Sequence, residues 1–383
     1  MKNISQVRQC ANCGACYNVC PADAIRVDAR GLFYRVEVDP QTCIGCGKCL
    51  QVCPVNRQEP RQELRSAWYG VHTDSRMVRR SSSGGAFTAL AQWILARDGV
   101  VYGACYTEDR KQVVFRGTDR VDLEQLRRSK YVESQVGMVF REVKQQLETG
   151  RMVLLCGTPC QVAGLLRFLG REYPNLYTCD FSCGGVPSHG IYQQYLQMLE
   201  GRYRSPVTEV NFRPKTLGWE DYAIRVDFAD GGRYECPGVL DPYFRAFLNK
   251  HCSVRDCCLE CRFADNHYGD LVLADFWKYR EFTGKRNRKG VSLILVNSRK
   301  GQQLLEAAAP QLDCRELDLE KASYNIKRKE YSRSVLDRRQ QFLQCVQSEG
   351  LAEARKYLDM PAGRNAMQIR LKSALKRILW GAK

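Results

Sequence analysis

The stretch CANCGACYNVCP, residues 10–21, has the same cysteine spacing as CIGCGKCLQVCP, residues 43–54. Each stretch follows the pattern CxxCxxCxxxCP. Bacterial ferredoxins with two clusters use this pattern, and the fourth cysteine of each stretch then binds the other cluster. The two stretches therefore predict a small α+β ferredoxin-like domain that holds two [4Fe–4S] clusters.

The crossed ligand pattern divides the eight cysteines into two sets of four. One cluster would be held by Cys10, Cys13, Cys16 and Cys53, and the other by Cys43, Cys46, Cys49 and Cys20. A pair of zinc sites is the alternative, but zinc motifs usually take two cysteines from a loop, and each loop here offers three. Two clusters in one small domain form a relay for single electrons, so another part of the chain must donate or accept them.

The composition is that of a large globular protein with a basic surface. The chain has 383 residues, 44% of them apolar, which suggests two or three domains. Its net charge of +17 favours anionic partners, such as an acidic redox protein or an anionic hydride-carrying cofactor. Because no basic run is interleaved with aromatic residues as a stacking platform would be, we expect no binding of nucleic acid. No export signal and no apolar stretch of ~18 residues is present, so we expect a cytoplasmic protein whose 20 cysteines serve metal chemistry rather than disulfides.

From Ser66 onward, strand and helix patterns alternate along the chain. Apolar strand patterns occur at 67–73, 100–106, 151–156 and 176–181, with helical patterns between them. Such alternation is typical of an α/β body with a mixed, largely parallel sheet. We therefore expect four regions, namely the dicluster domain at 1–59, the body at 66–145 and 146–320, and a basic helical C-terminal extension at 321–383.

The stretch RSSSGGAFTALAQWIL, residues 80–95, places three serines and two glycines at the start of an expected helix. Amides at a helix N-terminus, with small side chains around them, form a site that suits a pyrophosphate. A serine cap with a glycine turn is the alternative. Neither GxGxxG after a strand nor GxxxxGK[ST] is present, so the sequence does not support a Rossmann or P-loop nucleotide site.

Six motifs, in order, resemble the beta-subunit family of coenzyme F-420 hydrogenases and dehydrogenases, which includes the plant 7-hydroxymethyl chlorophyll a reductases. They are SSSGGAFTALA at Ser81, SKYVES at Ser129, CGTPCQVAGL at Cys156, DFSCGGVPS at Asp180, DLVLADFW at Asp270 and GVSLILVN at Gly290. The resemblance covers about 66–305 and divides the body into an N-terminal-type region and a C-terminal-type flavin and iron–sulfur region. It implies an iron–sulfur oxidoreductase that contains FAD. Two positions depart from the family pattern, since Gly184 stands in place of the usual histidine and Lys278 in place of the usual glycine.

The resemblance also implies where FAD would bind. Its pyrophosphate would be held by Ser82, Ser83, Gly84 and Gly85. Lys130 would be a catalytic cation near flavin N1, where it would stabilise the reduced anion, and a solvated surface lysine is the alternative.

The CGTPC motif follows a buried strand pattern and begins a helix, which places Thr158 and Cys160 where α/β folds bind ligands. Cys160 is a candidate reactive thiol or cluster ligand, because a helix N-terminus lowers the pKa of a thiol. A small buried side chain is the alternative. A third [4Fe–4S] cluster would use Cys160, Cys183, Cys258 and Cys261.

These features predict an oxidoreductase that exchanges a hydride at FAD with a deazaflavin-like or other carrier, and single electrons with ferredoxin or another redox protein. The alternative is an electron-transfer subunit that bridges a partner enzyme and has no substrate of its own. The basic segment 278–290 suits an anionic hydride donor, with a merely solvated loop as the alternative. In the tail, one helical stripe and the absence of acidic residues after Met360 suit contact with the inner face of a membrane, with docking onto the body or a partner as the alternative. The stripe consists of Met367, Leu371, Leu375, Ile378 and Leu379.

Overall fold

The dicluster domain is built from short helices and a β-hairpin. The computed structural model describes residues 3–57, 63–120, 123–322 and 330–380, so the predicted domain limits at residues 1, 59 and 383 lie outside the described residues. The elements of this domain are η1 (Ile4–Gln6), α1 (Ala15–Val19), β1 (Ile25–Asp28), β2 (Arg35–Val38) and α2 (Lys48–Gln51). Strands β1 and β2 pair antiparallel, with Ile25 opposite Val38. Gly14 and Gly47 precede the two α-helices with φ of 91° and 72°, a conformation that glycine adopts with least strain.

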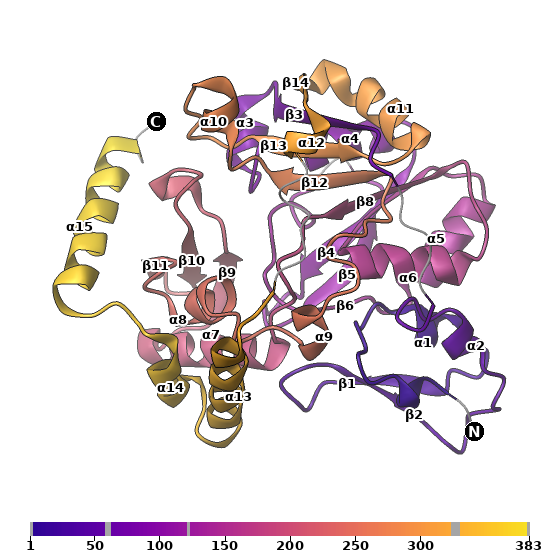
Figure 1. Ribbon diagram of the computed structural model, residues 1–383, viewed down its shortest axis with the longest axis horizontal. Coiled ribbons are helices and arrows are strands. Elements are labelled where there is room, and N and C mark those ends of the chain that lie inside the picture. Colours follow the sequence, from indigo (N-terminus) through magenta and orange to yellow (C-terminus); the bar gives the residue numbers. More distant parts are fainter. Residues whose placement is uncertain (1–2, 58–62, 121–122, 323–329, 381–383) are drawn as a thin grey trace.

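Among the described residues, nine strands form one mixed sheet at the centre of the body (Figure 1). In spatial order they are β14 (Leu312–Leu317), β3 (Ser66–His72), β13 (Ser292–Val296), β12 (Leu271–Asp275), β8 (Leu176–Phe181), β7 (Val153–Cys156), β4 (Val100–Tyr106), β5 (Val113–Thr118) and β6 (Ser134–Gln135). The middle strands β12, β8, β7 and β4 pair in parallel, and so do β5 and β6. The pairs β14–β3, β3–β13, β13–β12 and β4–β5 are antiparallel. The predicted α/β body with a mixed sheet is confirmed, and its parallel pairs are concentrated in the middle.

Helices cover both faces of this sheet. On one face, α4 (Ala86–Leu95) and α11 (Arg299–Ala308) pack against β4, β7 and β13. On the other face lie α5 (Val139–Glu148) and α6 (Pro159–Leu169). Helix α1 of the dicluster domain contacts α5 and α6. A Cβ at Gly164 of α6 would lie 3.0 Å from Cys13 Sγ, so glycine at this position lets the dicluster domain approach the body closely.

A smaller unit lies beside the body, on the left of Figure 1, and contacts the dicluster domain where Tyr34 stacks on His189. Its antiparallel sheet consists of β9 (Val207–Asn211), β10 (Ala223–Phe228) and β11 (Arg233–Pro237). The helical elements around it are α7 (His189–Tyr203), α8 (Pro242–Phe244), η3 (Arg245–Asn249), α13 (Arg333–Ser348), α14 (Leu351–Ala354) and η6 (Arg355–Leu358). Buried aromatic residues such as Tyr195, Phe212 and Phe342 join the sheet to these helices in one core. No pattern in the sequence had predicted this sheet.

The C-terminal helix α15 (Gly363–Trp380) lies alongside the smaller unit (Figure 1) and contacts it through polar side chains. Lys376 pairs with Asp221, Arg377 Nε lies 3.0 Å from Glu235 Oε1, and Ser373 is buried. The predicted helical extension is confirmed, and its apolar stripe, 56–74% exposed, consists of Met367, Leu371, Leu375, Ile378 and Leu379. None of the helices in the described ranges combines the length and apolar character needed to cross a bilayer.

Short elements complete the chain between these units. They are α3 (Ser75–Arg79), η2 (Lys215–Leu217), α9 (Asp256–Leu259), α10 (Tyr279–Thr283), η4 (Ala309–Gln311) and α12 (Leu319–Ala322). Helix α9 carries the CCLEC cysteines toward the dicluster domain, since Arg255, just before α9, donates to the carbonyl of Cys10. This contact places the second cysteine-rich region of the sequence beside the first.

Candidate functional site

A cavity of about 350 Å³, here called the central cavity, opens beyond the carboxyl ends of β7 and β8. The serine turn 81–85, the segment 126–134, the start of α6 and the segment 181–187 line it, together with Asn12 of the dicluster domain. Its volume lies within the range of small-molecule sites, roughly 300–1,000 Å³. Five of the six residues predicted to bind a cofactor line this cavity, namely Ser82, Ser83, Gly85, Lys130 and Thr158.

Gly84, the sixth predicted residue, packs behind the cavity instead of lining it. A Cβ at Gly84 would lie 2.4 Å from the carbonyl oxygen of Gly70 and 2.6 Å from the amide nitrogen of Ser292. Only glycine therefore lets the serine turn lie this close to β3 and β13. Next to it, Gly85 has φ of 94° and begins α4.

The serine hydroxyls of the turn already have partners. Ser83 Oγ donates to the Val291 carbonyl at 2.8 Å, whereas Ser82 Oγ accepts from the Ser129 amide at 2.8 Å. The proton of Ser82 stays available to an anion, since the bond to Ser129 uses the oxygen as acceptor. The turn thus offers the cavity one hydroxyl donor and the N-terminus of α4, whose partial positive charge attracts anions.

Lys130 reaches the central cavity as a partly buried amine. Its Nζ donates to the carbonyls of Arg127 at 2.7 Å and Arg128 at 3.3 Å. Burial lowers the pKa of Lys130 to about 8, because desolvation disfavours its charged form. The alternative of a solvated surface lysine does not agree with this environment.

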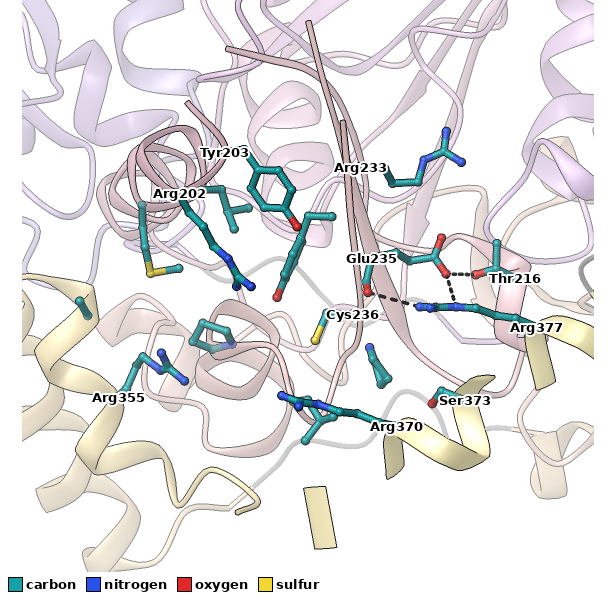
Figure 2. Close-up of a pocket in the computed structure, with 17 residues that line it drawn as sticks. Arg202, Tyr203, Thr216, Arg233, Glu235, Cys236, Arg355, Arg370, Ser373 and Arg377 are labelled. Atoms are coloured by element: carbon teal, nitrogen blue, oxygen red, sulfur yellow. Dashed lines mark hydrogen bonds and ion pairs between the residues drawn. The ribbon is translucent and has the colours of Figure 1, made fainter. Parts of the chain in front are cut away.

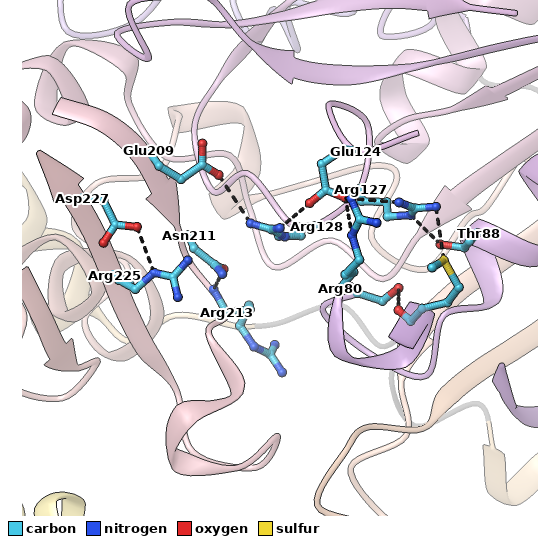
Figure 3. Close-up of polar contacts among 12 residues, drawn as sticks. Arg80, Thr88, Glu124, Arg127, Arg128, Glu209, Asn211, Arg213, Arg225 and Asp227 are labelled. Atoms are coloured by element: carbon cyan, nitrogen blue, oxygen red, sulfur yellow. Dashed lines mark hydrogen bonds and ion pairs between the residues drawn. The ribbon is translucent and has the colours of Figure 1, made fainter. Parts of the chain in front are cut away.

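A network of arginines and carboxylates fixes the segment that carries Lys130 (Figure 3). Glu124 pairs with Arg80 at 2.8 Å, with Arg127 at 3.1 Å and with Arg128. Arg128 also lies 3.4 Å from Glu209 of β9. This network ties the segment 124–130 both to the end of α3, just before the serine turn, and to the smaller sheet, so the amine of Lys130 has a defined position at the cavity.

A second buried lysine, Lys215 of η2, lies behind the serine turn. Its Nζ donates at 2.7 Å to the carbonyls of both Val78 and Ser83. Burial lowers the pKa of Lys215 to about 7. No local pattern indicates a role for this lysine, since its two acceptors lie 137 and 132 residues away along the chain.

The wall of the cavity also includes Asp275 and Trp277. Asp275 pairs with Arg213 at 3.0 Å and accepts from Trp219 Nε1 at 2.8 Å. The Trp219 ring stacks on Trp277, with centroids 4.9 Å apart. Asp275 therefore holds Arg213 and Trp219 behind this wall, and the buried Arg213 balances its charge.

Thr158 and Cys160 lie at the start of α6, as the CGTPC motif predicts. Thr158 caps the helix in a reciprocal arrangement with Gln161, and its Oγ1 lies 3.1 Å from Cys160 Sγ. Burial raises the pKa of Cys160, and the neighbouring thiols of Cys261, Cys183 and Cys13 raise it further. A reactive thiolate at Cys160 is therefore not favoured in the protein without cofactors, whereas a position among other thiols suits a cluster ligand.

The structure brings together the cysteines of the predicted third cluster, here called the third set. Cys183 has Cys261 and Cys257 as electrostatic neighbours, and Cys258 has Cys257 and Cys183. Cys160 and Cys183 also line the central cavity. The third set thus lies between the cavity and Cys13 of the dicluster domain. Cys257, which was not among the predicted ligands, is a further thiol beside it.

The eight cysteines of the dicluster domain separate into the two sets that the crossed pattern assigns. One small cavity is lined by the inner set, Cys10, Cys13, Cys16 and Cys53. Another is lined by the outer set, Cys20, Cys43, Cys46 and Cys49. Within the described part of the chain no three Cys, His, Asp or Glu side chains converge on a single ion. Four thiols around a small void fit the larger iron–sulfur cube, whose ligands stand at its corners.

A buried glutamate joins the dicluster domain to the body. Glu133, 1% exposed, pairs with Arg255 and accepts from Asn12 Nδ2 at 3.2 Å and from the Tyr34 amide at 3.1 Å. His189 Nδ1 lies 3.3 Å from the same carboxylate, and its ring stacks on Tyr34 at 3.7 Å between centroids. Glu133 belongs to the SKYVES motif, but the sequence offered no way to pair it with residues more than a hundred positions away.

The fold and these thiol sets define an iron–sulfur protein of the electron-transfer class. Residues 150–321 match the family model for the C terminus of the coenzyme F420 hydrogenase/dehydrogenase beta subunit, and residues 9–57 match that of the 4Fe-4S dicluster domain. Residues 150–321 are therefore similar to the C terminus of this oxidoreductase subunit, and residues 9–57 to a 4Fe-4S dicluster domain, in agreement with the resemblance seen in the motifs.

Comparison with solved structures finds a chain of the F420-reducing [NiFe] hydrogenase complex from Methanosarcina barkeri. It is 15% identical in sequence, and the match covers 74% of this chain and 93% of that chain with a TM-score of 0.48. A search of curated proteins gave no match.

Proposed function

We propose that this protein is an FAD-dependent oxidoreductase that exchanges a hydride with a soluble carrier and single electrons with ferredoxin or another redox protein. One observation carries the proposal: a single cavity is lined by the serine turn at the start of α4, by the buried Lys130, and by Cys160 and Cys183 of the third set. Bound FAD would supply the chemistry that converts a hydride into single electrons, because flavins handle electrons both in pairs and singly.

The residues of the serine turn would bind the pyrophosphate of FAD. Ser82 supplies a hydroxyl donor, and the first turn of α4, entered through Gly85, supplies backbone amides and a positive helix end. Ser83 holds the turn against β13 through Val291, and Gly84 allows its close packing. These two residues position the turn and leave direct contact with the pyrophosphate to their neighbours.

Lys130 would hold a positive charge beside the flavin ring. With a pKa of about 8 it is mostly protonated at neutral pH, so it attracts the electron-rich reduced form. Its two carbonyl acceptors and the network around Glu124 restrict the movement of the amine. Thr158 Oγ1 and Cys160 close the other end of the same space.

The three thiol sets would hold three [4Fe–4S] clusters in a line. The third set borders the central cavity, Cys160 has Cys13 of the inner set as a neighbour, and Cys16 of the inner set has Cys49 of the outer set as a neighbour. Cys46 of the outer set is exposed. This order suits the passage of single electrons between the cavity and a redox protein that docks at the surface.

The basic segment 278–290 would attract the hydride carrier. A Cβ at Gly290, the last residue of the segment, would lie 2.8 Å from the backbone of Ser83, so the segment ends against the serine turn. Its positive charge beside the cavity suits a phosphorylated, deazaflavin-like carrier.

The experiment that tests the proposal is anaerobic purification followed by titration. We expect a visible spectrum with flavin and iron–sulfur bands, and bleaching of the flavin band when a deazaflavin or NADH is added. The variant Lys130→Met is expected to lower the midpoint potential of the flavin, whereas Lys144→Met, on the exposed face of α5, serves as the matched control and leaves it unchanged. If only reduced ferredoxin bleaches the flavin band, the alternative of an electron-transfer subunit that bridges a partner enzyme is favoured. A preparation without flavin would refute the proposal.

We further propose that the protein is cytoplasmic and that the exposed stripe of α15 contacts the inner face of an anionic membrane. The helix has exposed basic residues, Arg364 and Lys372, beside the stripe and no acidic residue, a combination that suits an anionic lipid surface. Replacing Leu371 and Ile378 by serine should abolish sedimentation with vesicles that contain phosphatidylglycerol, and Met138→Ser, on α5's side of the body, is the control. Unchanged sedimentation of the double variant would contradict this contact.

A further inference from the structure

A second hollow, the arginine groove, lies in the smaller unit, where α15 crosses the edge of β11. It has a volume of about 1060 Å³ and is bounded by α7, β11, η6 and α15. None of its lining residues lines the central cavity. The function proposed above therefore does not account for it. Its wall contains five arginines, Arg202, Arg233, Arg355, Arg370 and Arg377.

Carboxylates neutralise two of these five arginines. Arg377 Nε lies 3.0 Å from Glu235 Oε1, and Arg233 Nε lies 2.5 Å from Asp227 Oδ1. These pairs anchor α15 to β11 and hold the strand end in place.

The other three arginines make no ion pair with a carboxylate in the part of the chain that the structure describes. Figure 2 shows the guanidinium groups of Arg202, Arg355 and Arg370 pointing into the same space from α7, η6 and α15, with Cys236 between them. All three are exposed residues, and positive charges that converge without a counter-ion repel one another. The arrangement therefore favours an anion in the middle of the groove.

The surface beneath the arginines is apolar. Leu199 is 2% exposed, and Leu240 and Pro242 continue the same surface. Tyr234 turns its hydroxyl away to donate to Asp241 Oδ2 at 2.8 Å, so its ring offers the groove a flat apolar face. The groove thus combines a positively charged rim with an apolar base.

We propose that the arginine groove binds an organic phosphate, with Arg202, Arg355 and Arg370 as its direct ligands. A phosphate group offers three oxygens to donors that approach from three sides, whereas a carboxylate offers two in one plane. The apolar base contacts the organic part of the ligand. Two sources provide this chemistry: a soluble phosphate ester, and the headgroup of a membrane lipid brought close by the exposed stripe of α15.

The test uses the full-length protein with its cofactors, purified anaerobically, and isothermal titration calorimetry. The probes are inorganic pyrophosphate, the soluble lipid dihexanoyl phosphatidic acid, and vesicles of phosphatidylcholine with and without phosphatidic acid. We expect dihexanoyl phosphatidic acid to bind more tightly than pyrophosphate, because it also covers the apolar base. Binding of the soluble lipid without binding of the vesicles would assign the groove to a soluble ester, and binding of both would assign it to a membrane lipid.

Variants separate the groove from general attraction to a basic protein. Arg370→Gln and Arg355→Gln, on different elements, should each weaken binding of the soluble lipid by about tenfold or more, the loss expected for a charge-assisted contact. Arg364→Gln, on α15 but outside the groove, is the matched control and should leave the affinity unchanged. The flavin and iron–sulfur bands should stay the same in all three variants. If no probe binds, or if Arg364→Gln weakens binding as much as Arg370→Gln, the assignment is wrong.

Discussion

Replacing Glu133 by glutamine should loosen the dicluster domain from the body. The carboxylate accepts from the Arg255 guanidinium, the Asn12 amide and the Tyr34 backbone N–H, and His189 Nδ1 lies 3.3 Å from it. Glutamine keeps the volume of the side chain but removes its charge and one of its acceptor oxygens. Arg255, 8% exposed, would then be a buried cation without a counter-ion.

The magnitude follows from the burial of this pair. Removing one partner of a buried ion pair costs about 3–5 kcal/mol, because the remaining charge stays desolvated. Since each 1.36 kcal/mol changes an equilibrium tenfold, the population with the interface open should rise roughly a hundredfold to five-thousandfold. The dicluster domain keeps its own hairpin and thiol sets, so the opening should be confined to the interface.

Hydrogen–deuterium exchange, read by mass spectrometry on the anaerobically prepared protein, measures this opening. Peptides that contain Tyr34 and His189 should exchange faster by that factor, whereas the buried core of α4 around Leu90 should keep its protection. Glu209→Gln is the matched control, because Glu209 pairs with arginines at a half-exposed site and such pairs contribute about 1 kcal/mol or less.

Two results would refute the reasoning about Glu133. Equal exchange at Tyr34 in wild type and variant would mean that the apolar contacts of α1 with α5 and α6 hold the domain without the ion pair. A uniform increase over the whole chain, α4 included, would mean that the substitution destabilises the body and not the interface.

Three further predictions concern the lysine, the glycines and the thiols. Burial lowers the pKa of Lys215 to about 7, whereas a lysine in the unfolded chain has a pKa of about 10.4. Between these two pH values the unfolded chain binds more protons than the folded protein. The contribution of Lys215 to the free energy of unfolding therefore rises with pH in this range. In Lys215→Met the apparent urea midpoint should therefore lose this rise between pH 7 and 9.5, and an unchanged pH dependence would contradict the burial of the amine. Gly84→Ala should lower the urea midpoint and the flavin content together, because the added Cβ meets backbone atoms. Gly201→Ala, where the surface of α7 leaves open space for a Cβ, should be neutral or slightly stabilising. Equal urea midpoints in the two variants would contradict the packing described for Gly84. Cys53→Ser should reduce the iron content of the protein by about one four-iron cluster. Cys314→Ser in β14, outside every thiol set, should leave the iron content unchanged. An equal loss of iron in both variants would exclude Cys53 as a specific ligand.

The elements with strong periodic patterns were predictable from the sequence. Strand β4 coincides with the predicted stretch 100–106, and β8 with 176–181, because both are buried runs between clear helical patterns. Helix α6 begins at Pro159 after the Thr158 cap, as local chemistry requires.

The smaller sheet was not predictable by the same means. Strand β11, RYECP, carries charged residues at two of its five positions and shows no buried position, so its pattern resembles a polar loop. Its neighbour β10 is recognisable only once α7 and α13 are known to cover it. The arginine groove depends on that sheet, and it was missed for the same reason.

Within the site, the sequence identified the residue types but not their orientation. The motif with Gly84 was recognised, yet only the packing against Gly70 and Ser292 places this glycine behind the cavity. The contacts of the buried Glu133 carboxylate involve Asn12 and Arg255, which are 121 and 122 residues away along the chain. Such contacts arise when separate elements meet, and no local pattern encodes them.

The exposure of the outer set determines which cluster of this protein would be lost first in air. Cys46 is exposed and its neighbour Ile44 is 68% exposed, whereas Cys13 and Cys16 of the inner set are buried. Dioxygen would therefore oxidise the cluster of the outer set first. Electron transfer to a docked partner would then stop while the clusters of the other sets were still intact. A sample exposed to air would keep much of its visible absorbance after it had lost electron transfer to partner proteins.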